Sequence, residues 1–268
     1  MHIIVCIKQV PDSSEVQTDP KTGNLIRDSA KTKMNPYDLY PLEEALKLKE
    51  SRGATVSVIS MGPLQALSTL QEAYALGADR AFLLSDRAFA GADVLATSYT
   101  LALGIESLAP YDLILCGKQT TDGDTAQVGA SIAQWLNLPS VCYVNRLEVM
   151  SDGFLVEADY DQFVQEVKLK APALLTIDKE ANTPRLPSYL LKKKNADKKI
   201  EILTLDDLLK IKTNRLKDEQ NYFGSTGSAT QVERMFQPVE EKANLVFKDQ
   251  GKELAKVAFQ ALRDRNLL

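Results

Sequence analysis

Short apolar runs and amphipathic stretches take turns along the first two-thirds of the chain. Residues 2–8 are apolar and rich in β-branched side chains, which is typical of a buried strand. Residues 36–52 place leucine and alanine on one face and charged side chains on the other, which predicts a helix ending at Gly53. Further strands are predicted at 54–60, 80–84 and 111–116, and further helices at 64–76, 93–108 and 124–136. This order predicts an α/β fold with a mostly parallel, doubly wound sheet.

The pattern changes after Pro139, where apolar and polar positions alternate over three consecutive segments. These segments are 141–149, 154–160 and 163–170. Turn signals at 151–153 and 161–162 separate them, so we predict an antiparallel hairpin at the edge of the sheet. One more buried strand is predicted at 173–177.

The last third of the chain is less regular. A short capped helix is predicted at 204–209 and an amphipathic helix at 252–265, with little periodicity between them. An extended segment without a core of its own should pack against another chain. We therefore predict an α/β domain at 1–190 and, at 191–268, an extended C-terminal arm that contacts a partner subunit.

Charge and hydropathy narrow the functional classes. The 268 residues include 32 basic and 36 acidic side chains, and this balance argues against a nucleic-acid partner. The lysines at 192–194 are flanked by acids, and we interpret them as a solvated face or a subunit contact. The first apolar run is too short for a signal peptide, and none is long enough to span a bilayer. We expect a cytoplasmic protein.

Histidine and cysteine usage removes several kinds of chemistry. The single histidine, His2, stands at the extreme N-terminus, which leaves no Ser-His-Asp triad and no histidine-rich metal site. Cys6, Cys116 and Cys142 are odd in number and widely spaced, which suits neither a disulfide framework nor a zinc site. We interpret Cys6 and Cys116 as buried small hydrophobes and expect no catalytic side chain and no bound metal.

The segment 117–129 is the strongest candidate for a ligand site. It follows a predicted strand and enters a predicted helix, and open parallel sheets bind ligands at such strand ends. Gly123 and Gly129 would let the backbone approach a ligand, and a helix start offers N–H groups to a phosphate. We expect either Asp122 or Asp124 to cap the helix and the other to accept a hydrogen bond from the ligand. The alternative is a capped helix after a polar loop, with no ligand.

Two further segments allow two interpretations each. Asn35–Asp38 either belongs to the ligand site or only starts a helix, because Asn35 suits an N-cap and Pro36 a first helical position. The Gly/Ser/Thr cluster at 224–230 is either a flexible link or a backbone nest for phosphate.

The motifs at these loops resemble those of the beta subunits of electron-transfer flavoproteins. The residues that carry the resemblance are 5–12 (VCIKQVPD), 34–38 (MNPYD), 60–63 (SMGP), 75–80 (ALGADR) and 116–119 (CGKQ). The resemblance spans about residues 1–200 in order and continues more loosely beyond. It implies an adenine-nucleotide alpha-hydrolase-like fold that pairs with an alpha subunit and transfers electrons.

The resemblance also implies where the cofactor and the partners bind. In the family, an adenine nucleotide contacts positions that correspond here to Cys6, Asn35, Pro36, Tyr37, Asp38, Met61, Asp122, Gly123, Asp124, Thr125, Ala126, Gln127, Val128 and Gly129. The loop at 181–189, with Leu186, Pro187 and Tyr189, corresponds to the segment that docks an acyl-CoA dehydrogenase-type partner.

The identity of the nucleotide stays open between FAD and AMP. The segment 122–129 resembles the electron-bifurcating form, in which the beta subunit holds FAD. Ser225, Thr226 and Thr230 lie in a segment that resembles the one near that flavin, although Ala229 stands where the family pattern has a proline. That form implies electron transfer from NADH to ferredoxin and to an acyl-CoA or lactate dehydrogenase-type flavoenzyme. A subunit with structural AMP and a nucleotide-binding module of the universal-stress type stay open as well.

Overall fold

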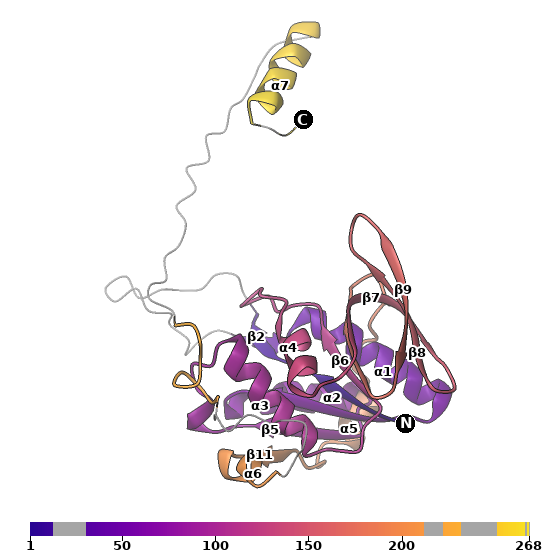
Figure 1. The fold of residues 1–268 in the computed structure, drawn as a ribbon, viewed down its shortest axis with the longest axis vertical. Helices are drawn as coiled ribbons and strands as arrows, with labels where there is room; N and C mark the ends of the chain where they lie inside the picture. Colours follow the sequence, from indigo (N-terminus) through magenta and orange to yellow (C-terminus); the bar gives the residue numbers. More distant parts are fainter. Residues whose placement is uncertain (13–30, 212–221, 232–250, 266, 268) are drawn as a thin grey trace. The chain divides into compact units, whose positions relative to one another are not determined.

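The computed structural model describes residues 1–12, 31–211, 222–231, 251–265 and 267, and the chain divides into two compact units, Met1–Val232 and Glu233–Leu268. A nine-stranded sheet forms the centre of the first unit (Figure 1), in the order β11-β5-β4-β1-β6-β10-β7-β8-β9. The parallel strands at its middle are β1 (His2–Cys6), β4 (Thr55–Met61), β5 (Arg80–Leu84), β6 (Leu113–Gly117) and β10 (Ala173–Ile177). The predicted α/β class and the mostly parallel sheet are confirmed.

The order of the strands reverses beside β1. After β1 the chain adds β4 and β5 on one side, and it then crosses back to add β6 and β10 on the other. Such a reversal opens a crevice between the two central strands at their carboxyl ends, because the connections leave in opposite directions. The ends of β1 and β6 therefore mark the place where a ligand is expected.

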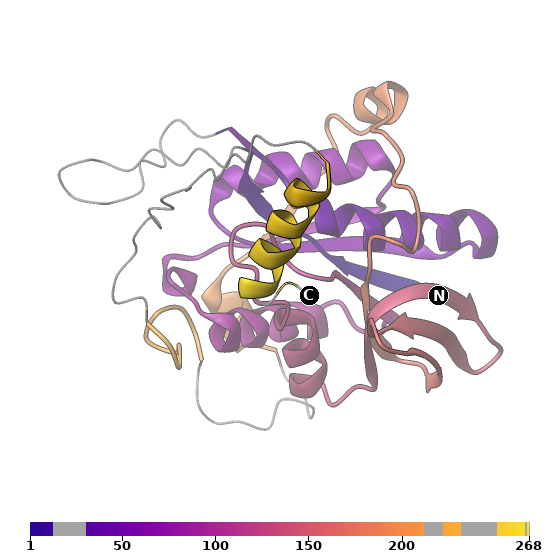
Figure 2. The ribbon, with the colours of Figure 1, turned by 90° about the horizontal axis from the view of Figure 1, so that it is seen from above.

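Helices cover both faces of the sheet, as Figure 2 shows from above. α1 (Leu39–Arg52) and α2 (Leu67–Leu76) pack on one face, and α3 (Val94–Glu106) and α4 (Val128–Trp135) pack on the other. Successive side chains of β1 alternate between the two cores: Ile3 and Val5 belong to the first and Ile4 to the second. An apolar run without alternation is thus explained by a strand that is buried on both faces.

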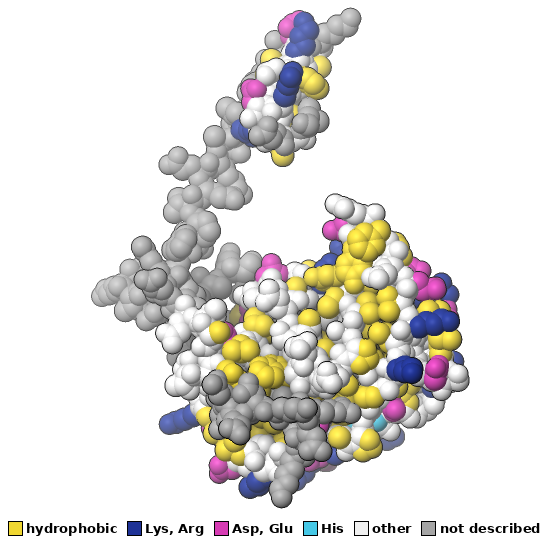
Figure 3. Space-filling view, in the orientation of Figure 1, with side chains coloured by type: hydrophobic (Ala, Val, Ile, Leu, Met, Phe, Trp, Pro, Cys, Tyr) yellow, Lys and Arg dark blue, Asp and Glu magenta, His cyan; other side chains and the backbone are white. Residues whose placement is uncertain are grey.

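The remaining predicted strands form the antiparallel edge. β7 (Ser140–Val149) runs parallel to β10, and β8 (Gly153–Asp159) and β9 (Val164–Lys170) continue from it as antiparallel strands. Phe163 and Val164 are exposed there, and Figure 3 shows apolar side chains over this part of the surface. A second, two-stranded sheet pairs β2 (Gln9–Pro11) with β3 (Thr32–Met34).

Short elements, of which only α6 (Leu205–Leu209) was predicted, complete the first unit. α5 (Tyr189–Lys194) contains the predicted lysine run, and β11 (Glu201–Leu203) adds a parallel edge strand beside β5. α6 follows with the predicted cap. Three 3-10 turns precede or join the helices: η1 (Pro36–Asp38), η2 (Leu64–Ala66) and η3 (Arg87–Phe89).

The second unit contains the predicted amphipathic helix, α7 (Lys252–Asp264). Val257, Phe259 and Leu262 are exposed on it. No helix in the described part of the chain is long and apolar enough to cross a membrane. The division after residue 190 and the role of 191–268 as a partner-binding arm stay predictions.

The described segment 222–231 packs onto the rest of the first unit through its aromatic residues. Phe223 is buried, and its ring centroid lies 5.7 Å from that of Phe89 and 5.3 Å from that of Tyr99. Gly224 follows with φ +55°, and a Cβ at that position would stand 2.1 Å from the carbonyl oxygen of Ala88. The residues after Phe223 are therefore held close to η3 and the start of α3.

We predict that Phe223→Ala lowers the free energy of unfolding by about 3 kcal/mol, because it removes a buried ring from this contact. Phe163→Ala removes a ring that is 58% exposed and should change the free energy by no more than about 0.5 kcal/mol. Urea denaturation of both variants measures the difference. Equal losses in the two variants would contradict the proposed anchoring.

Candidate functional site

The candidate site lies at the carboxyl ends of β1 and β6. Cys6 ends β1 and pairs in register with Cys116, the penultimate residue of β6. A hydrogen bond with Cys6, together with burial, raises the pKa of the Cys116 thiol well above its usual value. Both cysteines are free, and Cys116 is buried as expected, whereas Cys6 is only partly buried against the core.

Asn35 connects the site's loops through its side chain. Its Nδ2 donates to the carbonyl oxygen of Gln119 (2.9 Å), and its Oδ1 accepts from the N–H of Thr121 (3.2 Å). Asn35 has no exposed surface, and its own N–H donates to the carbonyl oxygen of Lys8. Although Asn35 precedes η1, its side chain makes no capping bond there. The amide therefore fastens the loop after β6 to the segment before α1, which a simple helix start would not require.

Asp38 holds the end of β1 from the same turn. Its carboxylate accepts from the N–H of Lys8 at 2.7 Å. Burial raises the pKa of Asp38 from 3.8 to about 7, although the hydrogen bonds with Asn35 and Lys8 act in the opposite direction. Gly117 faces this carboxylate so closely that a Cβ there would stand 2.4 Å from Asp38 Oδ1.

Lys8 neutralises the acid of the loop that follows β6. Its Nζ donates to both carboxylate oxygens of Asp122 at 2.7 Å. Burial opposes ionisation of Asp122, but hydrogen bonds and the charge of Lys8 outweigh it and lower the pKa of the carboxyl. Asp124 accepts a hydrogen bond from the side-chain amide of Gln119. These contacts reduce the repulsion that an anionic ligand would otherwise meet here.

The expectation about the cap of α4 is wrong. The helix begins at Val128 rather than near 124, and neither Asp122 nor Asp124 caps it. Asp124 and Ala126 adopt left-handed conformations with φ of 53° and 55°, which a right-handed helix cannot contain. Gln127 is the N-cap residue and makes no side-chain cap. The first N–H groups of α4 therefore lack a side-chain acceptor at the place predicted for a phosphate.

The two glycines of the loop differ in role. A Cβ on Gly129 would stand 2.7 Å from Thr176 Cγ2, so this glycine is needed where α4 packs on β10. A Cβ on Gly123 would meet only Thr120 Oγ1, at the ordinary distance of 3.5 Å. Gly129 therefore allows α4 to approach β10 closely, rather than allowing the backbone to approach a ligand. Gly123 has room beside it.

The predicted cofactor residues outside these loops lie at the end of β4 and against the connection between β5 and α3. Met61 ends β4 and packs partly buried against the core. Ser225 donates its N–H to the carbonyl oxygen of Ala90, and Thr226 Oγ1 donates to the carbonyl oxygen of Phe223. Thr230 donates from both its N–H and its hydroxyl to Asp93 at 2.9 Å. The segment 222–231 is therefore fastened after β5, and Asp93 is its anchor.

The predicted docking residues are exposed. Leu186 is 87% exposed and Tyr189 76% exposed, and Pro187 stands between Leu186 and the N-cap of α5. His2 lies away from these loops and contacts Ser57 and the carbonyl oxygen of Pro110 through its two ring nitrogens.

The patterns along the chain did not reveal the ion pairs that join the loops. Lys118 Nζ lies 2.8 Å from Asp178 Oδ2, and the hydrogen bond with Asp178 raises the pKa of Lys118. Asp178 follows β10 directly. A charged residue at the end of a buried apolar run could have indicated a site residue at this strand end. Lys8, Asp93 and Arg185 carried no comparable signal, because their partners lie far away in the sequence.

The chain is similar to known proteins over most of its length. Residues 22–208 match the family described as "Electron transfer flavoprotein domain". The chain is 43% identical over 270 residues to the electron transfer flavoprotein subunit beta of Thermoanaerobacterium thermosaccharolyticum, which covers 100% of both chains. It is 49% identical over 189 residues to the caffeyl-CoA reductase-Etf complex subunit CarD of Acetobacterium woodii, which covers 70% of this chain and 72% of that one.

We predict a pH-dependent stability that originates at Asp38. Between about pH 4 and pH 7 the folded state keeps the Asp38 proton and the unfolded state releases it, so stability falls as pH rises. The shift corresponds to a loss of up to about 4 kcal/mol across this interval. In Asp38→Asn this component of the slope should disappear, as measured by urea denaturation at several pH values.

Asp152→Asn is the matched control, because Asp152 lies in an exposed turn between β7 and β8. It should keep the slope of the parent protein. An Asp38→Asn variant with an unchanged slope would show that the Asp38 carboxyl titrates as it does in the unfolded chain.

Proposed function

Because this chain belongs to the electron transfer flavoprotein family, as a beta subunit, we propose that it holds FAD at the carboxyl ends of β1 and β6. With the alpha subunit it takes electrons from NADH and passes them to ferredoxin and to an acyl-CoA or lactate dehydrogenase-type flavoenzyme. Membership of this family replaces the interpretation as a universal-stress module. The cytoplasmic location stays a prediction.

One observation carries the cofactor site: three segments converge at the point where the strand order reverses. The end of β1, the turn at Asn35–Asp38 and the loop at 117–129 are joined by partly buried hydrogen bonds. Asn35 and Asp38 are both buried, and Gly117 provides the space that the Asp38 carboxylate occupies. Polar groups that converge at the point where the strand order reverses favour a bound nucleotide.

The donor groups suit an adenine nucleotide with a diphosphate. The start of α4 has no side-chain cap, so its free N–H groups and the positive end of the helix dipole favour a phosphate. On the same face of the sheet, α3 begins with a side-chain cap from Asp93. On the opposite face, α1 and α2 continue from the 3-10 turns η1 and η2. A helix that starts from a loop without a cap needs another partner for its N–H groups, which supports a ligand at α4.

Each residue of the site has a physical role in this proposal. Asn35 keeps the loop after β6 in a fixed position relative to β1, so the site is formed before the nucleotide binds. Lys8 balances the charge of Asp122 and lowers the electrostatic cost of bringing phosphates near it. FAD supplies the redox chemistry when bound, and the chain supplies position and electrostatics. Proton transfer by a histidine is not required.

FAD rather than AMP is favoured by the segment 222–231. This segment packs against the connection that follows β5, on the side of the sheet where the parallel strands have their carboxyl ends. The nucleotide loops lie on the same side, and a larger cofactor would reach farther along it. Its resemblance to the segment near the second flavin of bifurcating members points the same way. The similarity to the CarD subunit of a caffeyl-CoA reductase-Etf complex supports a dehydrogenase-type partner.

AMP is the second candidate, and one observation favours it. The hydroxyls of Thr226, Ser228 and Thr230 already make hydrogen bonds within the protein. A cofactor that needs hydrogen-bond donors from these three hydroxyls would have to displace these bonds. AMP would need only the loops of β1 and β6.

Cofactor analysis of the purified heterodimer decides between the candidates. We predict two molecules of FAD per heterodimer after denaturation, measured by chromatography of the released nucleotides, together with NADH oxidation that depends on ferredoxin. One FAD and one AMP would establish the second candidate. A heterodimer that releases neither a second flavin nor AMP would overturn the cofactor site.

Gly123→Val tests where the nucleotide lies. The free fold has room at Gly123, so the variant should change the free energy of unfolding of the nucleotide-free protein by no more than about 0.5 kcal/mol. The added side chain should nevertheless crowd the ligand and lower the amount of nucleotide that copurifies. Gly123→Ala should give an intermediate loss. Full retention of nucleotide by Gly123→Val would mean that the ligand does not approach this loop.

A further inference from the structure

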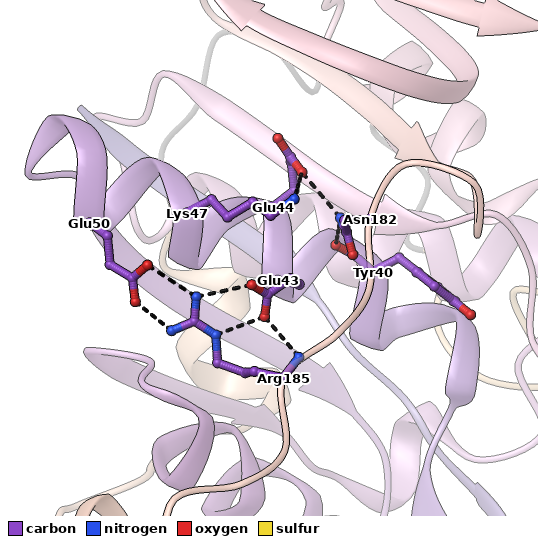
Figure 4. Close-up of polar contacts among 7 residues, drawn as sticks. All are labelled: Tyr40, Glu43, Glu44, Lys47, Glu50, Asn182 and Arg185. Carbon is purple, nitrogen blue, oxygen red and sulfur yellow. Dashed lines mark hydrogen bonds and ion pairs between the residues drawn. The ribbon is translucent and has the colours of Figure 1, made fainter.

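Arg185 makes the main ionic contact between α1 and the loop that joins β10 to α5. Arg185 donates from Nε and Nη2 to the two carboxylate oxygens of Glu43, at 2.8 and 3.0 Å, and its backbone N–H also donates to Glu43. Nη1 and Nη2 reach the carboxylate of Glu50, two turns farther along the helix. Figure 4 shows the guanidinium between the two carboxylates.

Two more contacts restrain the same loop. Asn182 Nδ2 donates to the carbonyl oxygen of Tyr40 (3.0 Å) and to Glu44 Oε2 (3.1 Å), so it also binds α1. Ser188 donates its N–H to the carbonyl oxygen of Ala75 at the end of α2 and caps α5 with its hydroxyl. The chain is thus held before and after residues 186 and 187.

Leu186 lies between these restraints and points to solvent. It is 87% exposed, whereas the Arg185 side chain beside it is 32% exposed and that of Glu43 only 7%. Tyr189 and Leu190 are each 76% exposed on the neighbouring turn. An apolar side chain that is held away from the protein, beside an arginine bound to the buried Glu43, has no internal packing role, which favours contact with another molecule.

The geometry of the clamp depends on an arginine. A guanidinium presents several N–H groups in a rigid plane and can bind two carboxylates at once, which a lysine ammonium cannot do in the same way. Loss of Arg185 would also leave the buried Glu43 carboxylate without its cation. The hydrogen bonds with Glu43 and then Glu50 raise the pKa of Arg185, and the hydrogen bond with Arg185 lowers the pKa of Glu50.

We propose that Arg185 is a positioning residue for partner docking, because its clamp on Glu43 and Glu50 holds Leu186 ready to enter a pocket of the partner. This inference rests on the proposed function, which includes an acyl-CoA dehydrogenase-type flavoenzyme as acceptor, and on the resemblance that relates the loop at 181–189 to the segment that docks such a partner. The lysines at 192–194 follow the exposed apolar residues directly, so the pocket is apolar with acidic side chains at its rim. Holding the loop in its bound conformation lowers the entropic cost of docking.

Helix α1 relates this loop to the cofactor site. The helix begins at the turn that contains Asn35 and Asp38, and it carries Glu43, Glu44 and Glu50 along its length. A rigid helix therefore positions the docking loop relative to the nucleotide loops. The hydrogen bonds that Arg185 makes in the described structure go to Glu43 and Glu50 and not to the nucleotide loops, so its loss should spare the cofactor.

The test compares variants in the intact heterodimer with its cofactors. The probe is whichever of purified butyryl-CoA and caffeyl-CoA dehydrogenases reacts with the parent heterodimer. Arg185→Gln should raise the KM for the heterodimer by about tenfold, with kcat and nucleotide content unchanged. Arg185→Lys should raise KM less than Arg185→Gln does, because lysine keeps the positive charge but not the planar guanidinium that binds two carboxylates. Amide hydrogen exchange at 179–188 should become faster in Arg185→Gln.

Two further variants separate the clamp from its surroundings. Arg146→Gln is the matched control, because it removes an exposed arginine–glutamate pair from the hairpin and should leave KM unchanged. If Arg185→Gln fails to fold, the double variant Arg185→Gln/Glu43→Gln removes the stranded carboxylate, and it should still show the higher KM. An unchanged KM in the folded variant, single or double, would overturn the inference.

Leu186→Glu separates two possible failures: that of the Arg185 clamp and that of the docking role proposed for the loop. If Leu186→Glu raises KM but the Arg185 variants do not, the loop docks without help from the clamp. If Leu186→Glu leaves KM unchanged, the docking role of the loop is wrong. If neither dehydrogenase reacts with the parent heterodimer, the proposed dehydrogenase-type acceptor is wrong, and the inference that rests on it is overturned with it.

Discussion

The buried turn at the start of α1 organises the whole site. Asn35 fastens the loop after β6, and Asp38 fastens the end of β1, although 84 residues separate Asn35 from Gln119 along the chain. Both side chains are buried, so they would cost free energy if these partners were lost. The turn therefore keeps the two central loops together whether or not a nucleotide is bound.

Helix α1 lies between the proposed cofactor site and the proposed docking loop. The 3-10 turn that precedes it belongs to the proposed nucleotide site, and the helix itself holds Asn182 and Arg185 of the proposed docking loop. An electron carrier must present its redox centre at a defined position to several partners, because electron transfer depends on how the two centres are placed. A helix that contacts both loops would fix their positions relative to each other.

The fold was largely predictable from the sequence, whereas the contacts within the site were not. The apolar run of β1 and the leucine pattern of α1 report burial directly, because period and burial are linked by backbone geometry. The start of α4 was misplaced because left-handed residues such as Asp124 have no reliable pattern in a single sequence. Pairs such as Lys8–Asp122 and Arg185–Glu43 lie 114 and 142 residues apart, and no local pattern reports them.

The proposed site requires the loops of β1 and β6 to enclose an adenine nucleotide whose phosphates meet the start of α4. An electron-density map of the cofactor-loaded heterodimer would reveal where the nucleotide lies. We expect phosphate density against the backbone N–H groups at 127–129, with the adenosine beside the turn at 35–38. Ordered water in that position, with the nucleotide bound elsewhere on the subunit, would refute the site.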